Sequence, residues 1–398
     1  MQHFLAKYSH KILHMNPLVD QMSSFLVMDI LERAHALQAQ GIDIIHLEVG
    51  EPDFDVPTAG SEAILDAVRT GNTHYTHSMG SPELRQAIAD RYKREHSVQV
   101  DPDCILIASG SSPALLLCTL LLCQPGSEVL LSNPGYACYR NFALAAQAKP
   151  VEYPLQAEHH FQTRVEDIRP LIRPQTAALF INTPTNPTGA IIPPQTLKEL
   201  ASLDIPIISD EIYHGLSYEQ KASSLLEFTD QAFVVNGFSK RYAMTGLRLG
   251  YLIAPKQHMR ALQTLQQNLF ICAPSLAQRA GLAVLKHSES EVEQMRLAYR
   301  ERRDYLLKRL LKMGFHIPCM PEGAFYIYCD ARSFTDDSYA FAFEVLEHAH
   351  VGITPGVDFG SSGTHYVRFS YANTLENLRE GMNRLETFLH NRTQHLIV

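Results

Sequence analysis

Five polar stretches that could do chemistry each follow a short apolar run. They are SGSSP (109–113), SNPGY (132–136), NTPTNPTG (182–189), DEIY (210–213) and NGFSK (236–240). In open α/β sheets, ligands bind beyond the carboxyl ends of the strands, where the residues that follow the strands meet. No single stretch is specific, but their shared position predicts one ligand site at one end of one sheet.

The SGSSP stretch predicts the start of a helix, because its proline suits the first helical turn. Backbone amides and hydroxyl groups at a helix N-terminus can bind a phosphate group. Taken alone, such a stretch is more often an ordinary serine cap. Two groups favour a phosphate: the planar guanidinium of Arg248 and the hydroxyl of Ser239.

Asp210 directly follows the apolar residues PIIS (206–209), so we expect its carboxylate to be buried and paired. A helix cap or a structural ion pair is the usual role of such an aspartate. The alternative is an acceptor that holds a proton on a ring nitrogen. Tyr213 and Asn186 could then hydrogen-bond a phenolic oxygen of the same ring, although Asn186 also lies in a turn-forming sequence.

Lys240 stands just beyond the apolar run FVV (233–235), although lysine is usually a solvated surface residue. Tyr136 could stack on an aromatic ligand or be an ordinary core tyrosine. Arg368 alternates with apolar neighbours in YVRFSY (366–371), which is typical of a strand. Its guanidinium could clamp a carboxylate there, or it could be exposed or structurally paired.

The elements that must position these residues follow from the apolar pattern between residues 60 and 285. Strands that are apolar along their whole length are buried on both faces, as in a mostly parallel sheet between helices. Candidate helices alternate with these runs at 61–69, 82–95 and 194–202. The alternation predicts an α/β domain. The runs are ILIA (105–108), VLL (129–131), ALFI (178–181), PIIS (206–209), FVV (233–235) and GYLI (250–253).

The pattern changes after residue 285. A long helical stretch at 291–313 is followed by strand-like pieces at 324–330 and 365–371, with another helix near 338–349. This looser order predicts a smaller α+β domain at 286–398. We assign residues 1–59, which include a candidate helix near 26–40, to an N-terminal arm that belongs partly to that domain.

The composition limits the classes of function. Of 398 residues, 45% are hydrophobic and 19% are charged, as in a folded soluble protein of two domains. The net charge of −8 provides no general basic field for nucleic acid or an anionic membrane. The longest apolar run, at 114–123, is too short to span a bilayer and predicts a buried helix. The seven cysteines and the histidines lack metal-ligand spacing. We therefore expect a cytoplasmic protein without a metal site and without nucleic-acid or membrane partners.

Several motifs together resemble the class I/II aminotransferases, which are pyridoxal 5′-phosphate (PLP) enzymes of fold type I. This resemblance implies a mostly parallel seven-stranded sheet between helices in the large domain. The motifs occur in the order of that family, and they extend from residue 47 to 371. The motifs are LEVGEPDF (47–54), YTHSMGSPELRQAIA (75–89), SGSSPALL (109–116), NPGYACY (133–139), NTPTNPTG (182–189), SDEIYHGL (209–216), SKRYAMTGLRLGY (239–251) and YVRFSY (366–371).

The resemblance implies a role for each matching residue at the cofactor ring. Lys240 matches the lysine that binds the cofactor covalently and later carries a proton. Asp210 matches the aspartate that pairs with the pyridine nitrogen, which makes the ring an electron sink. Tyr213 and Asn186 match the partners of the phenolic oxygen. Tyr136 matches the ring that stacks on the pyridine.

Further roles implied by the resemblance concern the phosphate, the substrate and the second subunit. Tyr75 matches a tyrosine that reaches the phosphate of the neighbouring subunit, which implies a homodimer with shared active sites. Arg368, Asn186 and the backbone at Gly50 match the site of the substrate α-carboxylate. The residues that match the phosphate site are Gly110, Ser111, Ser112, Ser239 and Arg248.

The implied reaction is a ping-pong transfer of the α-amino group of an amino acid to a 2-oxo acid. Position 112 is serine, where family members that act on dicarboxylic substrates often have lysine. Neutral or aromatic amino acids are therefore favoured, with glutamate/2-oxoglutarate or alanine/pyruvate as the shared pair. A carbon–sulfur lyase or a cyclopropane-forming synthase on the same scaffold is the alternative. No GxGxxG or GxxxxGK[ST] motif supports a nucleotide-binding enzyme.

Overall fold

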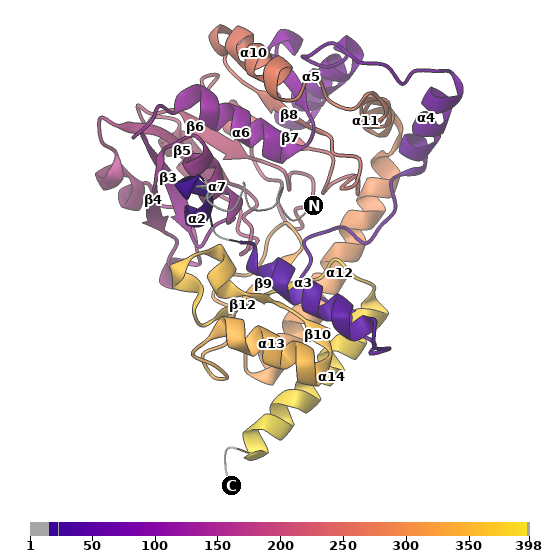
Figure 1. Ribbon diagram of the computed structural model, residues 1–398, viewed down its shortest axis with the longest axis vertical. Coiled ribbons are helices and arrows are strands. Elements are labelled where there is room, and N and C mark those ends of the chain that lie inside the picture. Colours follow the sequence, from indigo (N-terminus) through magenta and orange to yellow (C-terminus); the bar gives the residue numbers. More distant parts are fainter. Residues whose placement is uncertain (1–15, 23, 396–398) are drawn as a thin grey trace, which may run out of the picture.

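The structure is a computed structural model that describes residues 16–22 and 24–395. Its largest sheet has seven strands in the order β2-β8-β7-β6-β5-β3-β4 (Figure 1). β8 runs antiparallel to both of its neighbours, and the other pairings are parallel. The prediction of a mostly parallel α/β sheet is therefore confirmed. The strands are β2 (Ile105–Ala108), β3 (Glu128–Asn133), β4 (Lys149–Pro154), β5 (Thr176–Asn182), β6 (Ile207–Asp210), β7 (Phe233–Gly237) and β8 (Gly250–Ile253).

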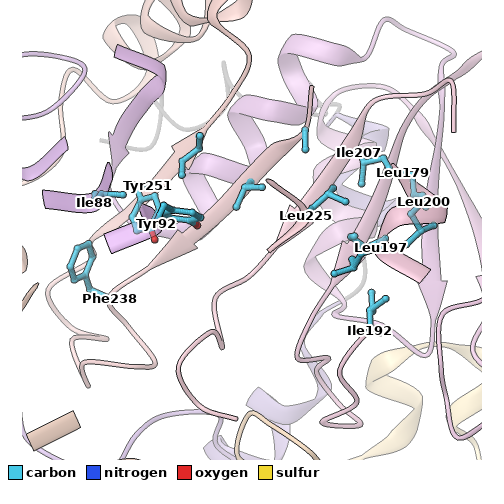
Figure 2. Packing of buried hydrophobic residues seen from close by; sticks show 14 of the residues in the cluster. Ile88, Tyr92, Leu179, Ile192, Leu197, Leu200, Ile207, Leu225, Phe238 and Tyr251 are labelled. Atoms are coloured by element: carbon cyan, nitrogen blue, oxygen red, sulfur yellow. The ribbon is translucent and has the colours of Figure 1, made fainter. Parts of the chain in front are cut away.

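Helices cover both faces of this sheet because successive strand residues point to opposite sides. On one face, α5 (Pro82–His96), α9 (Pro194–Leu200) and α11 (Ser275–His287) pack against alternate strand residues. Figure 2 shows this packing, with Leu197 and Leu200 of α9 against Leu179 and Ile207 of β5 and β6. Burial of each such leucine or isoleucine side chain contributes about 1.5–3 kcal/mol to the free energy of folding.

The opposite face is covered by α6 (Ser111–Leu122), α7 (Cys138–Ala145) and α10 (Met259–Leu269). The apolar run at 114–123 lies almost entirely in α6, where Leu117 and Cys118 are fully buried, so the predicted buried helix is confirmed. The seven strands agree with the fold that the resemblance implied, but β4 was not among the six apolar runs. Its sequence KPVEYP buries only Tyr153 fully, because it forms the edge of the sheet.

The C-terminal part builds a second core around a three-stranded antiparallel sheet in the order β11-β12-β9. Residues of the N-terminal helix α3 pack into this core, and Figure 1 shows α3 lying beside α13. A short parallel pair, β1 with β10, ties the segment after α3 to the same unit. The elements are α3 (Leu26–Gln38), β1 (Ile45–His46), α12 (Glu289–Met313), β9 (Tyr326–Asp330), α13 (Ser338–Ala349), β10 (Val351–Gly352), β11 (Thr354–Pro355), β12 (Tyr366–Ser370) and α14 (Leu375–His395).

The N-terminal segment touches both cores. The short helix α2 (Pro17–Gln21) packs on α7 of the large sheet, whereas α3 packs on the C-terminal core. Residues 1–15 of the predicted arm lie outside the described residues, and the boundaries at 59–60 and 285–286 stay predictions. Remaining helices include α4 (Thr58–Arg69), which packs against α11.

Across the described residues, no helix has the length and apolar character needed to cross a membrane. The same part of the chain contains no group of three histidine, cysteine, aspartate or glutamate side chains that could hold a metal ion. The cytoplasmic location stays a prediction.

Candidate active site

A cavity of about 320 Å³ lies where the carboxyl ends of β5, β6 and β7 face the C-terminal core. The wall formed by the large sheet is polar. Asn182 ends β5, Asp210 ends β6, and Lys240 follows β7. Many residues predicted from separate motifs therefore meet in one place. Those that line the cavity are Gly50, Ser111, Tyr136, Asn186, Asp210, Tyr213, Lys240 and Arg368.

Lys240 lies three residues beyond β7, and its ammonium Nζ donates a hydrogen bond to the carbonyl oxygen of Gly50 at 2.5 Å. Removal from water lowers the pKa of this amine to about 8, against 10.5 for a free lysine. The guanidinium groups of Arg368 and Arg248 act in the same direction. At this pKa roughly a tenth of the amine is neutral at pH 7, far more than for a free lysine, and only the neutral form can act as a nucleophile or base.

Asp210 ends β6 and is almost completely buried. Burial raises the pKa of its carboxyl to about 6, and two donors oppose this effect. The hydroxyl of Tyr139 donates to Oδ2 at 2.7 Å, and the backbone amide of Ile212 donates to Oδ1 at 3.1 Å. The carboxylate is thereby held ionised at neutral pH, with acceptor capacity left for a cationic partner in the cavity.

Arg368 lies on β12 and is buried against the cavity. Its Nη1 donates to Oδ1 of Asn186 at 2.8 Å, and its Nη2 donates to the carbonyl oxygen of Glu48 at 2.7 Å. The guanidinium also lies 4.2 Å from the ring centroid of Tyr326. These contacts hold a buried cation in a fixed orientation, while Nε has no hydrogen-bond partner among the described residues.

Tyr213 and Asn186 are each held by a neighbour that the motifs did not identify. The hydroxyls of Tyr213 and Tyr326 lie 2.9 Å apart and share a hydrogen bond. The side chain of Asn182, at the end of β5, accepts from the backbone amide of Asn186 at 2.8 Å and donates to the carbonyl oxygen of Asp210 at 2.9 Å. Asn182 therefore links the NPTG turn to the end of β6.

The start of α6 forms a second polar region next to the cavity. Gly110 has a φ of +110°, and a side chain there would meet Nη2 of Arg248 at 2.6 Å. The guanidinium therefore lies next to Gly110, the N-cap residue of α6, where the first backbone amides of the helix need acceptors. Ser111 lines the cavity, whereas Ser112, Ser239 and Arg248 do not. Arg248 is solvent-exposed and donates to the carbonyl oxygen of Thr245.

Tyr75 does not line the cavity. It is 82% exposed and borders a separate surface hollow between α5 and α11. The prediction for Tyr75 concerned the site of a neighbouring subunit, and it stays a prediction.

Residues 42–385 match the family model for aminotransferase class I and II. The chain belongs to this family.

The sequence of this aminotransferase is similar to those of its relatives along nearly its whole length. The (5-formylfuran-3-yl)methyl phosphate transaminase of Methanocaldococcus jannaschii is 41% identical, over 92% of this chain and 97% of the relative. The aromatic-amino-acid aminotransferase 2 of Thermococcus litoralis is 37% identical, over 88% and 93% of the two chains. The solved aspartate aminotransferase of Thermus thermophilus with maleate has a TM-score of 0.91 and 35% identity, over 95% of this chain and all of that one. The chain is thus a PLP-dependent aminotransferase of the aspartate aminotransferase fold.

Several cavity residues of this aminotransferase were missed by the sequence interpretation. Tyr139 and Tyr326 lie inside quoted motifs or strands but carried no signal that distinguishes them from core tyrosines. Asp358 and Phe359 come from the 3₁₀ turn η6 (Gly356–Phe359), which follows β11. Further apolar wall residues are Phe25, Val27, Met28 and Leu31, at and just before the start of α3.

Proposed function

We propose that this aminotransferase acts on neutral or aromatic amino acids, with glutamate/2-oxoglutarate or alanine/pyruvate as the shared pair. The observation that supports this class is the wall formed by Phe25, Val27, Met28 and Leu31. Among the described lining residues, only Lys240 and Arg368 are cationic, and the carboxyl of Asp358 faces the same space. A substrate side chain therefore meets apolar atoms rather than a second cation that would attract a distal carboxylate.

The residues at the strand ends fit PLP in their donor and acceptor types. Asp210 is a buried acceptor for a protonated pyridine nitrogen, and Tyr213 and Asn186 offer hydrogen bonds to the phenolic oxygen. Tyr136 supplies an aromatic ring at the cavity wall. When bound, the cofactor supplies an electron sink for the bonds to the substrate Cα.

The phosphate of the cofactor would be held at the start of α6. Arg248 lies close to Gly110, the N-cap residue of α6, so its guanidinium and the first amides of that helix could both bind a dianion placed there. Ser111, Ser112 and Ser239 add hydroxyl groups along this edge. Tyr75 would complete the site from the partner subunit of a homodimer, consistent with its exposed position.

The substrate carboxylate would be bound by Arg368, with Asn186 and the backbone at Gly50 beside it. The guanidinium is already oriented by Asn186 and by the carbonyl oxygen of Glu48, so little ordering is needed when a carboxylate arrives. Because Nζ of Lys240 donates a hydrogen bond to the carbonyl oxygen of Gly50, the amine lies next to the proposed carboxylate site. Lys240 would there take the proton from the substrate Cα and pass it to C4′ of the cofactor, and the second half-reaction would run these two transfers in reverse.

A screen of transamination tests this proposal. Holoenzyme is incubated with each of a set of amino acids and with 2-oxoglutarate or pyruvate, and the product amino acid is quantified. We expect leucine, phenylalanine or similar donors to exceed aspartate. A clear preference for aspartate would overturn the proposed substrate class. Release of ammonia and pyruvate without any 2-oxo acid acceptor would instead identify a lyase on the same scaffold.

A further inference from the structure

Helix α3 begins without a capping side chain of its own. The residue at its N-cap position is Phe25, whose backbone is extended and whose ring cannot accept a hydrogen bond. The first amides of a helix need acceptors, which Ser, Thr, Asp or Asn usually provide at this position. The start of α3 therefore depends on an acceptor from elsewhere in the fold.

Asp358 provides that acceptor. Its Oδ1 accepts from the backbone amide of Leu26 at 2.8 Å, although the two residues are 332 positions apart. Asp358 is buried, and burial raises the pKa of its carboxyl, against the effect of the Leu26 amide. Placing a carboxylate in such a position is unfavourable unless it is hydrogen-bonded, which ties Asp358 to the helix start.

The capped turn carries the apolar wall of the active-site cavity. Phe25, Val27 and Met28 belong to this first turn, and all three line the cavity together with Asp358. Farther along α3, contacts with α13 hold the helix: Arg33 pairs with Glu347, and the hydroxyl of Tyr339 donates to Asp29 at 3.2 Å. The far part of α3 is thus fixed by α13, and the cavity end by Asp358.

The same 3₁₀ turn also contacts the carboxylate site. The ring of Phe359, which follows Asp358, lies 4.9 Å from the guanidinium of Arg368. One short segment therefore touches both the side-chain wall and the arginine that would bind the substrate carboxylate. A displacement of this segment would alter the distance between the two.

We propose that Asp358 is a positioning residue for substrate selectivity: it holds the first turn of α3 over the cavity and so forms the surface that large apolar side chains contact. This inference rests on the proposed function. Alanine, whose methyl group is too small to reach this wall, would be processed independently of the cap. Leucine and phenylalanine would lose binding when the turn is released.

The test compares Asp358→Ala with Asp358→Asn in the full-length holoenzyme. In Asp358→Ala, we expect the ratio of kcat/KM for phenylalanine to that for alanine to fall about fivefold. This fold-change corresponds to the helix stability that is typically lost with a capping residue. The change should lie in KM rather than kcat. Asp358→Asn keeps an oxygen acceptor and should recover most of the ratio, because asparagine caps helices as well as aspartate.

A binding measurement does not depend on turnover. The dissociation constants of 3-phenylpropionate and of acetate are obtained from the change in cofactor absorbance. We expect Asp358→Ala to weaken 3-phenylpropionate about fivefold and to leave acetate unchanged. Hydrogen exchange should also become faster at residues 26–28 but not near the contacts of Arg33 and Tyr339.

Asp101→Ala is the matched control. Asp101 caps the short turn before β2, at the opposite end of that strand from the cavity. This variant should leave the kcat/KM ratio of phenylalanine to alanine and both dissociation constants unchanged. An equal loss for phenylalanine and alanine in Asp358→Ala, or unchanged ratios, would overturn the inference. Failure of the wild-type holoenzyme to transaminate any apolar amino acid would instead contradict the proposed function.

Discussion

The two walls of the cavity differ in origin and in chemistry. The wall of the large sheet includes the polar residues Asn182 and Asp210 at strand ends, Lys240 just beyond one, and Tyr139 in α7. The opposite wall consists of the first turn of α3 and the turn at Asp358 and Phe359, and its side chains are mostly apolar. Each residue of the first wall lies in or beside a short motif that follows a strand, whereas the second wall joins two segments more than 300 residues apart.

This difference has a physical reason. A charged group that takes part in catalysis must be buried, paired and held in one orientation. The end of a strand provides this because neighbouring strands of the sheet fix its backbone position. A side-chain pocket needs only apolar surface of the right size, which different segments can provide. We therefore expect changes in the polar wall to affect all substrates, and changes in the apolar wall to affect large ones.

The largest effect is expected for Lys240→Ala. Loss of the proton-transferring amine should lower transamination of every amino acid by about 10²–10⁴-fold. The cofactor should still bind, because Asp210 and the start of α6 are unchanged, and absorbance of the dialysed protein checks this. Lys221→Ala, at an exposed position, is the control and should retain activity. A Lys240→Ala enzyme of near-normal rate would show that the amine is not the proton carrier.

Arg368→Gln should have the next largest effect. Truncating a buried, hydrogen-bonded charge that binds a carboxylate costs about 2–5 kcal/mol, or about 30-fold or more in kcat/KM. The loss should be the same for alanine and phenylalanine, since both carry the α-carboxylate. Steady-state kinetics with both substrates measure it, with Arg384→Gln, a half-buried arginine outside the cavity, as control. A loss confined to one substrate would place Arg368 in the side-chain wall instead.

Capture of the cofactor should depend on pH. The pKa of Lys240 is lowered to about 8, and only the neutral amine attacks a carbonyl. The rate at which cofactor-free protein captures PLP should therefore rise about fifty-fold between pH 6 and pH 8 and level off above. Stopped-flow absorbance measures this rate. Arg368→Gln removes a charge that lowers this pKa, so its profile should move to higher pH. A wild-type inflection near the pKa of free lysine would contradict the burial argument.

Tyr139→Phe should reduce cofactor affinity about tenfold or more. The hydroxyl bonds Oδ2 of Asp210 at 2.7 Å, and hydrogen bonds to charged groups contribute about 1.5–3 kcal/mol. Without this donor the carboxyl of Asp210 becomes a weaker partner for a cationic ring at neutral pH. Titration of cofactor-free protein with PLP measures the dissociation constant. Tyr153→Phe, which loses a buried hydrogen bond to Phe180 outside the cavity, serves as control and should bind normally.

The smallest effect is expected for Met28→Ala in the apolar wall. Met28 is 47% exposed, so truncation removes partial contact with a large side chain. We expect a loss of about threefold to fivefold in kcat/KM for phenylalanine and little change for alanine. Met320→Ala, which is exposed outside the cavity, is the control. A larger effect on alanine than on phenylalanine would remove the distinction between the two walls.

The sequence by itself determined the large sheet and the residues at its strand ends. The six apolar runs are strands because strands buried on both faces must be apolar along their whole length. Polar residues at their carboxyl ends or just beyond, such as Asp210 and Lys240, are then placed at one end of the sheet. The edge strand β4 was missed because an edge position relaxes that requirement. The membership of the family followed from the same local motifs.

Only the tertiary structure decided how the cavity is closed. Tyr139 and Tyr326 were indistinguishable from core tyrosines until their hydroxyls were placed against Asp210 and Tyr213. Likewise, neither Leu26 nor Asp358 indicates its partner, because the hydrogen bond that caps α3 joins residues 332 positions apart. Local patterns encode burial and backbone geometry, which depend on neighbours in sequence. Contacts between distant segments depend on the packing of the whole fold.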